Sequence, residues 1–232
     1  MSKDRAVLEG YELRKSYASS NDRIDVLKGV TLSLSKGEII AVVGPSGVGK
    51  STLLHLLGAL DKPDSGRIVV DGVDVLSLSE DELSAFRNRR FGFVFQFHHL
   101  LPELTALENV MMPCMISGMK PAQAEKRARK ILIEDVGLEG RLDHRPRELS
   151  GGEQQRVAVA RALVMNPLVV LADEPSGNLD PENSRLLHDL IWELRDRLGQ
   201  SYVIVTHNLE LASRCDRVLK LFDGVVEEVK IY

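Results

Sequence analysis

Alternating apolar and polar positions mark the first part of the chain. In the run VLKGVTLSLSKG at residues 26–37, Val30, Leu32 and Leu34 alternate with polar residues, a spacing typical of β-strands with one buried face. Turn-forming residues stand at SSND (19–22) and at Lys36-Gly37. We therefore predict short antiparallel strands from the N-terminus to about residue 36.

Continuous apolar runs predict a second kind of strand. EIIAVVG (38–44), VVLAD (169–173) and YVIVTH (202–207) are almost entirely apolar. Strands have this composition when both faces are buried, as in a parallel sheet covered by helices. The expected fold class is α/β, with a mainly parallel core sheet and an antiparallel β subdomain.

Helical patterns replace these strands in the middle of the chain. Thr105 and Glu108 form a capping-box pattern, and Pro121 stands in the first turn of an amphipathic segment that ends at Gly137. We predict an α-helical subdomain at about 97–150, inserted into the core of a single domain that spans residues 1–232. The tail after Asp216 predicts a hairpin that turns at Asp223-Gly224.

Composition and net charge indicate a globular α/β protein and argue against some functions. The 232 residues suit one α/β domain with a subdomain, and 44% hydrophobic residues suffice for a core. A net charge of −4, from 30 basic and 34 acidic residues, argues against a nucleic-acid-binding protein. Cys114 and Cys215 stand in no metal-binding spacing, so we expect free thiols. We expect no secretory signal, and no apolar run approaches the roughly 18 residues of a membrane span.

The stretch GPSGVGKST has the spacing of a phosphate-binding loop. It matches G-x-x-x-x-G-K-[ST] and lies between an apolar strand and the helical run STLLHLLGAL. Glycines let backbone N–H groups turn onto phosphate oxygens, and the helix N-terminus adds its dipole. Lys50 is predicted to reach the β- and γ-phosphates, and the Ser51 hydroxyl to bind Mg²⁺. The predicted nucleotide-binding residues are Gly44, Pro45, Ser46, Gly47, Val48, Gly49, Lys50, Ser51 and Thr52.

Hydrolysis also needs a metal carboxylate and a group that orients water. Asp173 ends an apolar strand at the carboxyl edge of the predicted sheet, where ligands bind, and is the expected Mg²⁺ carboxylate, acting through water. Glu174 follows and is the expected water-polarising base. His207 ends the strand YVIVTH at the same edge and is expected to contact the γ-phosphate. The predicted catalytic residues are therefore Glu174, His207 and Lys50.

A second possible phosphate cradle stands at Ser150, Gly151 and Gly152. These residues precede a helical run whose apolar stripe includes Val157 and Leu163. An ordinary helix N-cap has the same sequence, because serine and glycine are common there. If Ser150, Gly151 and Gly152 bind an anion, they cannot easily contact the phosphates of a nucleotide that the loop Gly44–Thr52 already surrounds. A head-to-tail pair of chains, in which each cradle closes on the other chain's γ-phosphate, fits a two-fold dimer.

The order of these motifs resembles the ATP-binding cassette (ABC) ATPases. The shared motifs are Gly44–Thr52, Gln96, LSGGE (149–153), VVLADE (169–174), SGNLD (176–180) and His207, which together cover nearly the whole chain. The resemblance implies a P-loop NTPase fold with a RecA-like core, ATP and Mg²⁺ as ligands, and a homodimer of ATPase subunits.

The same resemblance assigns further residues. It implies that Tyr17 stacks on adenine, that Gln96 links Mg²⁺ to the helical subdomain, and that Ser150, Gly151, Gly152 and Glu153 contact nucleotide. It also places residues 178–180 at the dimer seam, where many family members have alanine in place of Asn178.

A narrower resemblance is to the ATPase subunits of lipoprotein-releasing complexes. FQFHHLLPELTALENVMMP (95–113), with RNRRFGFVFQ (87–96) leading into it, shows this likeness. It implies a peripheral protein on the cytoplasmic face of the bacterial inner membrane, partnered by integral membrane transporter subunits and not by nucleic acid. Residues 97–104 are then a predicted docking surface; core packing of the helical subdomain is the alternative.

Other functions remain open at this point. The nearest alternative is the ATPase of a macrolide-exporter-type or cell-division-type ABC complex. A soluble ABC protein acting on ribosomes or DNA is less favoured, because such proteins usually fuse two cassettes or insert a long coiled coil. The motif LSGGE (149–153) argues against a P-loop kinase or GTPase.

Overall fold

The described residues form two compact units. The computed structural model describes residues 6–19 and 22–230. The first unit comprises the chain up to residue 87, residues 171–173 and the chain from residue 201 onward, and the second comprises residues 88–170 and 174–200. The predicted helical subdomain, at about 97–150, lies within the second unit. The centre of the predicted turn at 19–22, Ser20-Asn21, lies outside the described residues.

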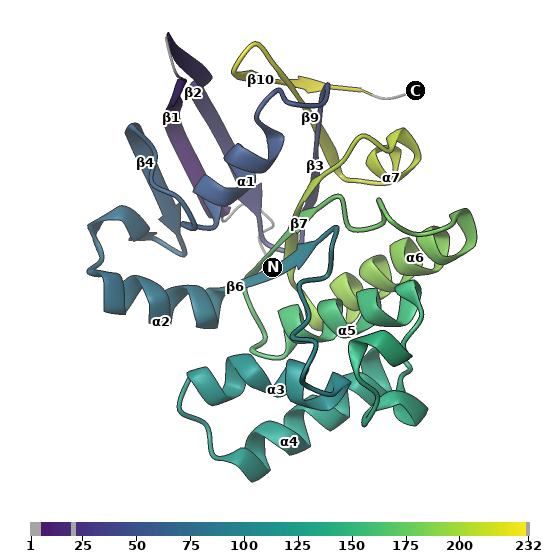
Figure 1. The fold of residues 1–232 in the computed structure, drawn as a ribbon. Helices are drawn as coiled ribbons and strands as arrows, with labels where there is room; N and C mark the ends of the chain where they lie inside the picture. Colours follow the sequence, from purple (N-terminus) through teal and green to yellow (C-terminus); the bar gives the residue numbers. More distant parts are fainter. Residues whose placement is uncertain (1–5, 20–21, 231–232) are drawn as a thin grey trace. The chain divides into compact units, whose positions relative to one another are not determined.

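The first unit contains an antiparallel sheet of four strands in the order β2-β1-β4-β5 (Figure 1). The strands are β1 (Ala6–Ser19), β2 (Asp22–Ser35), β4 (Ser65–Val70) and β5 (Val73–Asp74). Val30, Leu32 and Leu34 of β2 are buried and alternate with exposed residues, as the sequence pattern predicts. The predicted antiparallel β subdomain is thereby confirmed.

The first unit also contains parallel strands. β3 (Ile39–Val43) pairs in parallel with β8 (Ser201–Val205) and with β9 (Arg217–Phe222). The end of β7 (Val169–Asp173) lies next to β8. All five residues of β3 are buried. β10 (Val225–Val229) pairs antiparallel with β9 after a turn in which Asp223 and Gly224 have φ values of 46° and 78°. The predicted hairpin is therefore confirmed, with the left-handed turn residues that two-residue hairpins favour.

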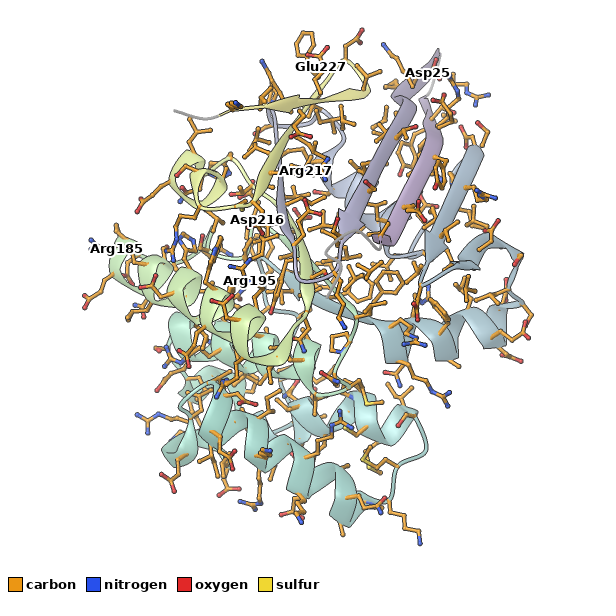
Figure 2. All side chains as sticks on the ribbon, turned by 180° about the vertical axis from the view of Figure 1, so that it is seen from behind. Asp25, Arg185, Arg195, Asp216, Arg217 and Glu227 are labelled. Carbon is orange, nitrogen blue, oxygen red and sulfur yellow. The ribbon has the colours of Figure 1, made fainter. Side chains whose placement is uncertain are left out.

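Polar side chains secure the start of β9. The Asp216 carboxylate accepts a hydrogen bond of 2.8 Å from the Ile39 N–H, which ties β9 to β3. Arg217 lies next to Asp216 and forms ion pairs with Glu38 at 3.1 Å and with Glu228 at 3.0 Å (Figure 2). These contacts join the parallel strands to the hairpin. The helices of this unit are α1 (Lys50–Leu57), η1 (Val75–Ser77), most of α2 (Glu80–Arg90) and α7 (Leu209–Ser213).

The second unit is mainly helical. Its elements are β6 (Phe91–Phe95), the start of β7 (Val169–Asp173), α3 (Ala106–Ile116), α4 (Pro121–Lys130), the π-helical turn η2 (Ile131–Asp135), the short 3₁₀ helices η3 (Glu139–Arg141) and η4 (Pro146–Glu148), α5 (Gly151–Leu163) and α6 (Pro181–Leu198). The predicted capping box of Thr105 and Glu108 is present at the start of α3. Pro121 opens α4 as predicted.

The segment 121–137 differs from the continuous helix that its periodicity predicts. α4 ends at Lys130, and the chain widens into η2, in which the Val136 N–H donates to the Ile131 carbonyl at 3.1 Å. Ile131, Leu132 and Val136 are all buried. The apolar face that the periodicity predicts is therefore buried, although its last turn is π-helical.

Helix α6 was not assigned from the sequence, although its start has clear signals. The Asp180 carboxylate accepts from the N–H groups of Glu182 and Asn183, both at 3.0 Å, and Pro181 occupies the first turn. Arg185 and Arg195 mark the two halves of this helix (Figure 2). Gly199 ends it in the left-handed conformation that is common at helix C-termini.

Candidate functional site

The phosphate-binding loop lies in the first unit, between the end of β3 and the start of α1. Gly49 is the N-cap of α1 with a φ of 105°, and a Cβ atom there would lie 2.5 Å from Cγ1 of Val26. Gly47 has a φ of 78°. Both positions therefore favour glycine, and Gly49 is the second glycine of the motif.

Lys50 is held inside this loop. Its side chain is buried, and its Nζ atom donates to the Gly44 and Pro45 carbonyls at 2.9 and 3.0 Å. The first turn of α1 has no acidic residue, and the Leu53 N–H already bonds to the Gly49 carbonyl at 2.9 Å. The earlier N–H groups of the helix point toward the loop, where an anion can accept from them.

His207 lies beside the loop, but not at the end of a strand as predicted. β8 ends at Val205, and Thr206 donates its N–H to the Val42 carbonyl at 3.1 Å. The Thr206 hydroxyl then accepts from the Asn208 N–H at 3.0 Å, which turns the chain toward α7. His207 is exposed in this turn and lines a hollow with Gly44 and Lys220. The structure therefore brings His207 to the phosphate-binding loop.

Asp173 and Ser51 are also residues of the first unit. Asp173 ends β7 and is partly exposed, and Ser51 is exposed in the first turn of α1. Carboxylate and hydroxyl oxygens are donors that suit Mg²⁺, which usually keeps several waters and takes its other ligands from phosphates. The donor set therefore fits the predicted ion. Within the described residues, no cluster of three or more His, Cys, Asp or Glu side chains forms an all-protein metal site.

Tyr17 projects from β1 of the first unit. Its side chain is 43% exposed, and its hydroxyl donates to Oδ2 of Asp61 at 3.1 Å. The ammonium of Lys15 lies 5.2 Å from the ring centroid. An exposed ring held at its hydroxyl is a suitable platform for a planar base, which remains the predicted role.

Gln96 and Asn178 bind each other in the second unit. The Gln96 amide donates to Oδ1 of Asn178, and the Asn178 amide donates to the Gln96 carbonyl, both at 3.0 Å. The sequence predicts separate roles for Gln96 and Asn178 and does not predict their pairing. The two hydrogen bonds join Gln96, which follows β6, to the loop that precedes α6.

Ser150 caps α5, as its neighbours in sequence suggest. Its hydroxyl accepts from the Glu153 N–H at 3.2 Å, and the Glu153 carboxylate accepts from the Ser150 N–H at 2.8 Å. This bond and an ion pair of 2.6 Å with Arg141 hold the pKa of Glu153 below its ordinary value. The ordinary N-cap is therefore present, and it leaves Gly151 exposed at the helix start.

Glu174 begins the turn that leads from β7 to α6. Its φ is 46°, an unusual value for a residue with a side chain and especially for one that precedes proline. The Gly177 N–H donates to the Glu174 carbonyl at 2.9 Å and closes the turn. Backbone strain of this kind is often found at functional sites.

The segment 97–104, which we call the docking segment, exposes large apolar side chains. Phe97 is 70% exposed and Leu101 is 44% exposed. The buried side chain of Asn109 accepts from the Leu101 N–H at 2.8 Å and donates to the carbonyls of Leu101 and Leu104, both at 3.1 Å. The backbone of the segment is therefore fixed while two of its apolar side chains face solvent.

Arg161 of α5 also holds the docking segment and was missed from the sequence. Its guanidinium donates to the carbonyls of His98 and His99, each at 2.6 Å, and both residues have positive φ values of 56° and 47°. Burial, and then the nearby charge of Arg161, lower the pKa of the His98 imidazole. An arginine within the apolar run VAVARAL was the available signal for such a contact.

Comparisons with known proteins agree with the motif order. Residues 27–177 match the family model described as ABC transporter. The chain is 55% identical over 221 residues to the lipoprotein-releasing system ATP-binding protein LolD of Bacteroides thetaiotaomicron, a match that spans 95% of this chain and 98% of that protein. LolD of Legionella pneumophila (strain Paris) is 54% identical over 94% of this chain and 96% of its own length.

Solved structures show the same architecture. The dimeric ATP-binding cassette MJ0796, in a post-hydrolysis state bound to ADP and Pi, superposes with a TM-score of 0.88 at 39% identity, over 97% of this chain and 99% of that one. CbiO1 of Clostridium perfringens, part of the ABC transporter complex cbiONQ, gives a TM-score of 0.83 at 31% identity, over 96% of this chain and 87% of its own. The predicted α/β fold class of a P-loop NTPase is thereby confirmed.

Replacing Lys50 by alanine tests the phosphate-binding loop. Lys50→Ala removes the buried ammonium and should raise the barrier to ATP hydrolysis by about 3 kcal/mol or more, as for other catalytic electrostatic groups. Steady-state phosphate release and ATP binding are the measurements, with the exposed Lys36→Ala as control. Near-normal turnover by folded Lys50→Ala would refute the assignment.

Proposed function

The chain belongs to the ABC transporter family of ATPases, and we propose that it is the ATP-hydrolysing subunit of a complex that releases lipoproteins from the bacterial inner membrane toward the outer membrane. The observation that carries this proposal is the similarity to proteins named for lipoprotein release over 95% of the chain. The buried Lys50 in its phosphate-binding loop supports the ATPase role independently.

The residues of the first unit are assigned to nucleotide binding. The loop from Gly44 to Gly49 and the start of α1 surround the phosphates, and the Lys50 ammonium offsets their charge. Tyr17 stacks on adenine, and His207 contacts the γ-phosphate. Ser51 and Asp173 would hold Mg²⁺, which supplies charge neutralisation at the β- and γ-phosphates when bound.

The residues of the second unit are assigned to hydrolysis and to dimer closure. Glu174 accepts a proton from the attacking water and orients it. Ser150, Gly151 and Gly152 bind the γ-phosphate of ATP held by a second copy of the chain. Two ATP molecules are then enclosed by a head-to-tail homodimer, whose two-fold symmetry makes the two sites equivalent.

The docking segment is assigned to an integral membrane partner. Phe97 and Leu101 are exposed on a backbone that Asn109 and Arg161 hold in place, so they can transmit movement to a partner helix. The complex would lie at the inner membrane with this subunit on the cytoplasmic face. Among the described residues, no helix has both the length and the apolar character needed to cross a bilayer. A macrolide-exporter-type or cell-division-type complex is the alternative.

Glu174→Gln should bind ATP but hydrolyse it very slowly, because the amide keeps the shape of the side chain and loses the base. Since the γ-phosphate then stays in place, dimers should accumulate when ATP is added. Size-exclusion chromatography with and without ATP measures this. A variant that binds ATP yet stays monomeric in both conditions would contradict the shared-site model.

Leu101→Glu should leave the basal ATPase activity of the isolated subunit unchanged and abolish co-purification with the membrane subunits, because it places a charge on the docking segment. The control is Leu198→Glu, at an exposed leucine of α6 outside the segment, which should assemble normally. If Leu101→Glu fails to fold, the segment is core and the docking assignment is wrong. Normal assembly of folded Leu101→Glu would also contradict it.

A further inference from the structure

Gln155 is a fully buried glutamine in the middle of α5. Its Nε2 atom donates to the Pro175 carbonyl at 2.6 Å and makes a longer contact of 3.5 Å with the Phe95 carbonyl. Its Oε1 atom has no hydrogen-bond partner within residues 6–19 and 22–230. An unpaired buried acceptor destabilises a fold, so stability alone does not account for glutamine at this position.

The carbonyl that Gln155 holds belongs to the residue after Glu174. Glu174 has its φ of 46° immediately before proline, a backbone conformation that surrounding contacts must maintain. The Gly177 N–H closes this turn from one side by donating to the Glu174 carbonyl. Gln155 holds the Pro175 carbonyl from α5 and thereby fixes the middle of the same turn.

A second buried contact fixes the turn from α6. Ser176 is buried, and its Oγ atom lies 2.9 Å from Nε2 of His188, which is also buried. The turn from Glu174 to Gly177 is therefore attached to two helices by side chains that solvent does not reach. The Gln155 contact attaches it to the helix that begins at Ser150.

We infer that Gln155 is a positioning residue for the Glu174 carboxylate, an inference that rests on the proposed role of Glu174 as the water-polarising base. The amide of Gln155 sets the turn, and the turn sets where the carboxylate lies. Hydrolysis requires this carboxylate to align a water molecule, whereas ATP binding does not. Loss of the Gln155 amide therefore lowers kcat and leaves the affinity for ATP unchanged.

Gln155→Met tests the inference, because methionine has a similar volume and no amide. In the full chain, kcat for ATP hydrolysis should fall by about tenfold to a hundredfold, the effect of a small misplacement of a catalytic group. The dissociation constant for ATP and the unfolding temperature should stay close to those of the unmodified chain. Phosphate release, nucleotide binding and thermal unfolding are the measurements.

Gln200 provides a matched control in the same unit. It is also buried, its Nε2 atom donates to Oδ1 of Asn166 at 3.0 Å, and its Oε1 atom likewise has no partner in the described part of the chain. Gln200→Met makes the same chemical change away from Glu174 and should leave kcat unchanged. An equal fall in kcat for both variants would show a general effect of buried amides and overturn the inference.

Glu174→Gln in the same assay separates failure of the inference from failure of the proposed function. If Glu174→Gln hydrolyses ATP normally, the assigned role of Glu174 is wrong. If Glu174→Gln is inactive and folded Gln155→Met retains the original kcat, the positioning role alone is wrong. Should Gln155→Met not fold, Gln155→Leu replaces it with the same expectation. If neither folds while Gln200→Met does, Gln155 is required for folding and the positioning role is also wrong.

Discussion

The unpaired N–H groups at the start of a helix are the physical feature on which the chemistry of this chain depends. Each helix offers a few such donors, and they bind anions when no side chain occupies them. The N-cap of α1 is Gly49, which has no side chain to cap the helix, and the first turn of α1 lacks an acidic residue. The N-cap of α5 is Ser150, whose hydroxyl already accepts from the Glu153 N–H.

This difference explains why one chain can contain two glycine-rich helix starts. The first is open and has the Lys50 ammonium inside its loop, so it can surround a phosphate chain within its own unit. The second is capped, and the negative charge of Glu153 beside it is offset by Arg141. It retains the exposed Gly151, and in the proposed dimer it would meet the terminal phosphate of ATP held by the other chain.

Three polar side chains of helix α5 and its N-cap form hydrogen bonds within the second unit. Ser150 caps its start, Gln155 holds the turn after Glu174, and Arg161 holds the backbone of the docking segment. A shift of α5 would therefore move both the turn that begins at Glu174 and the docking segment. In the proposed complex, this arrangement would couple ATP hydrolysis to movement of the membrane partner.

The fold and the binding loop were largely predictable because they rest on local patterns. The parallel strands, the capping box of Thr105 and the turn at Asp223-Gly224 follow from periodicity and from residue type. Long-range polar contacts were not predictable. The pairing of Gln96 with Asn178, and of Gln155 with Pro175, joins residues far apart in sequence, and no local pattern identifies the partner. The π-helical turn after α4 was also not predictable, because the apolar spacing of residues 121–137 is that of a regular helix.

Mixing two inactive variants tests whether the helix start at Ser150 binds the nucleotide of a second chain. Ser150→Arg blocks closure on the partner's γ-phosphate and leaves its own binding loop intact, whereas Lys50→Ala disables that loop. In a mixed dimer one composite site has both lesions and the other has neither. Ser150→Arg alone should still bind ATP, and mixing it with Lys50→Ala should restore part of the ATPase activity. Loss of ATP binding by folded Ser150→Arg would instead show that both helix starts act on one nucleotide within one chain.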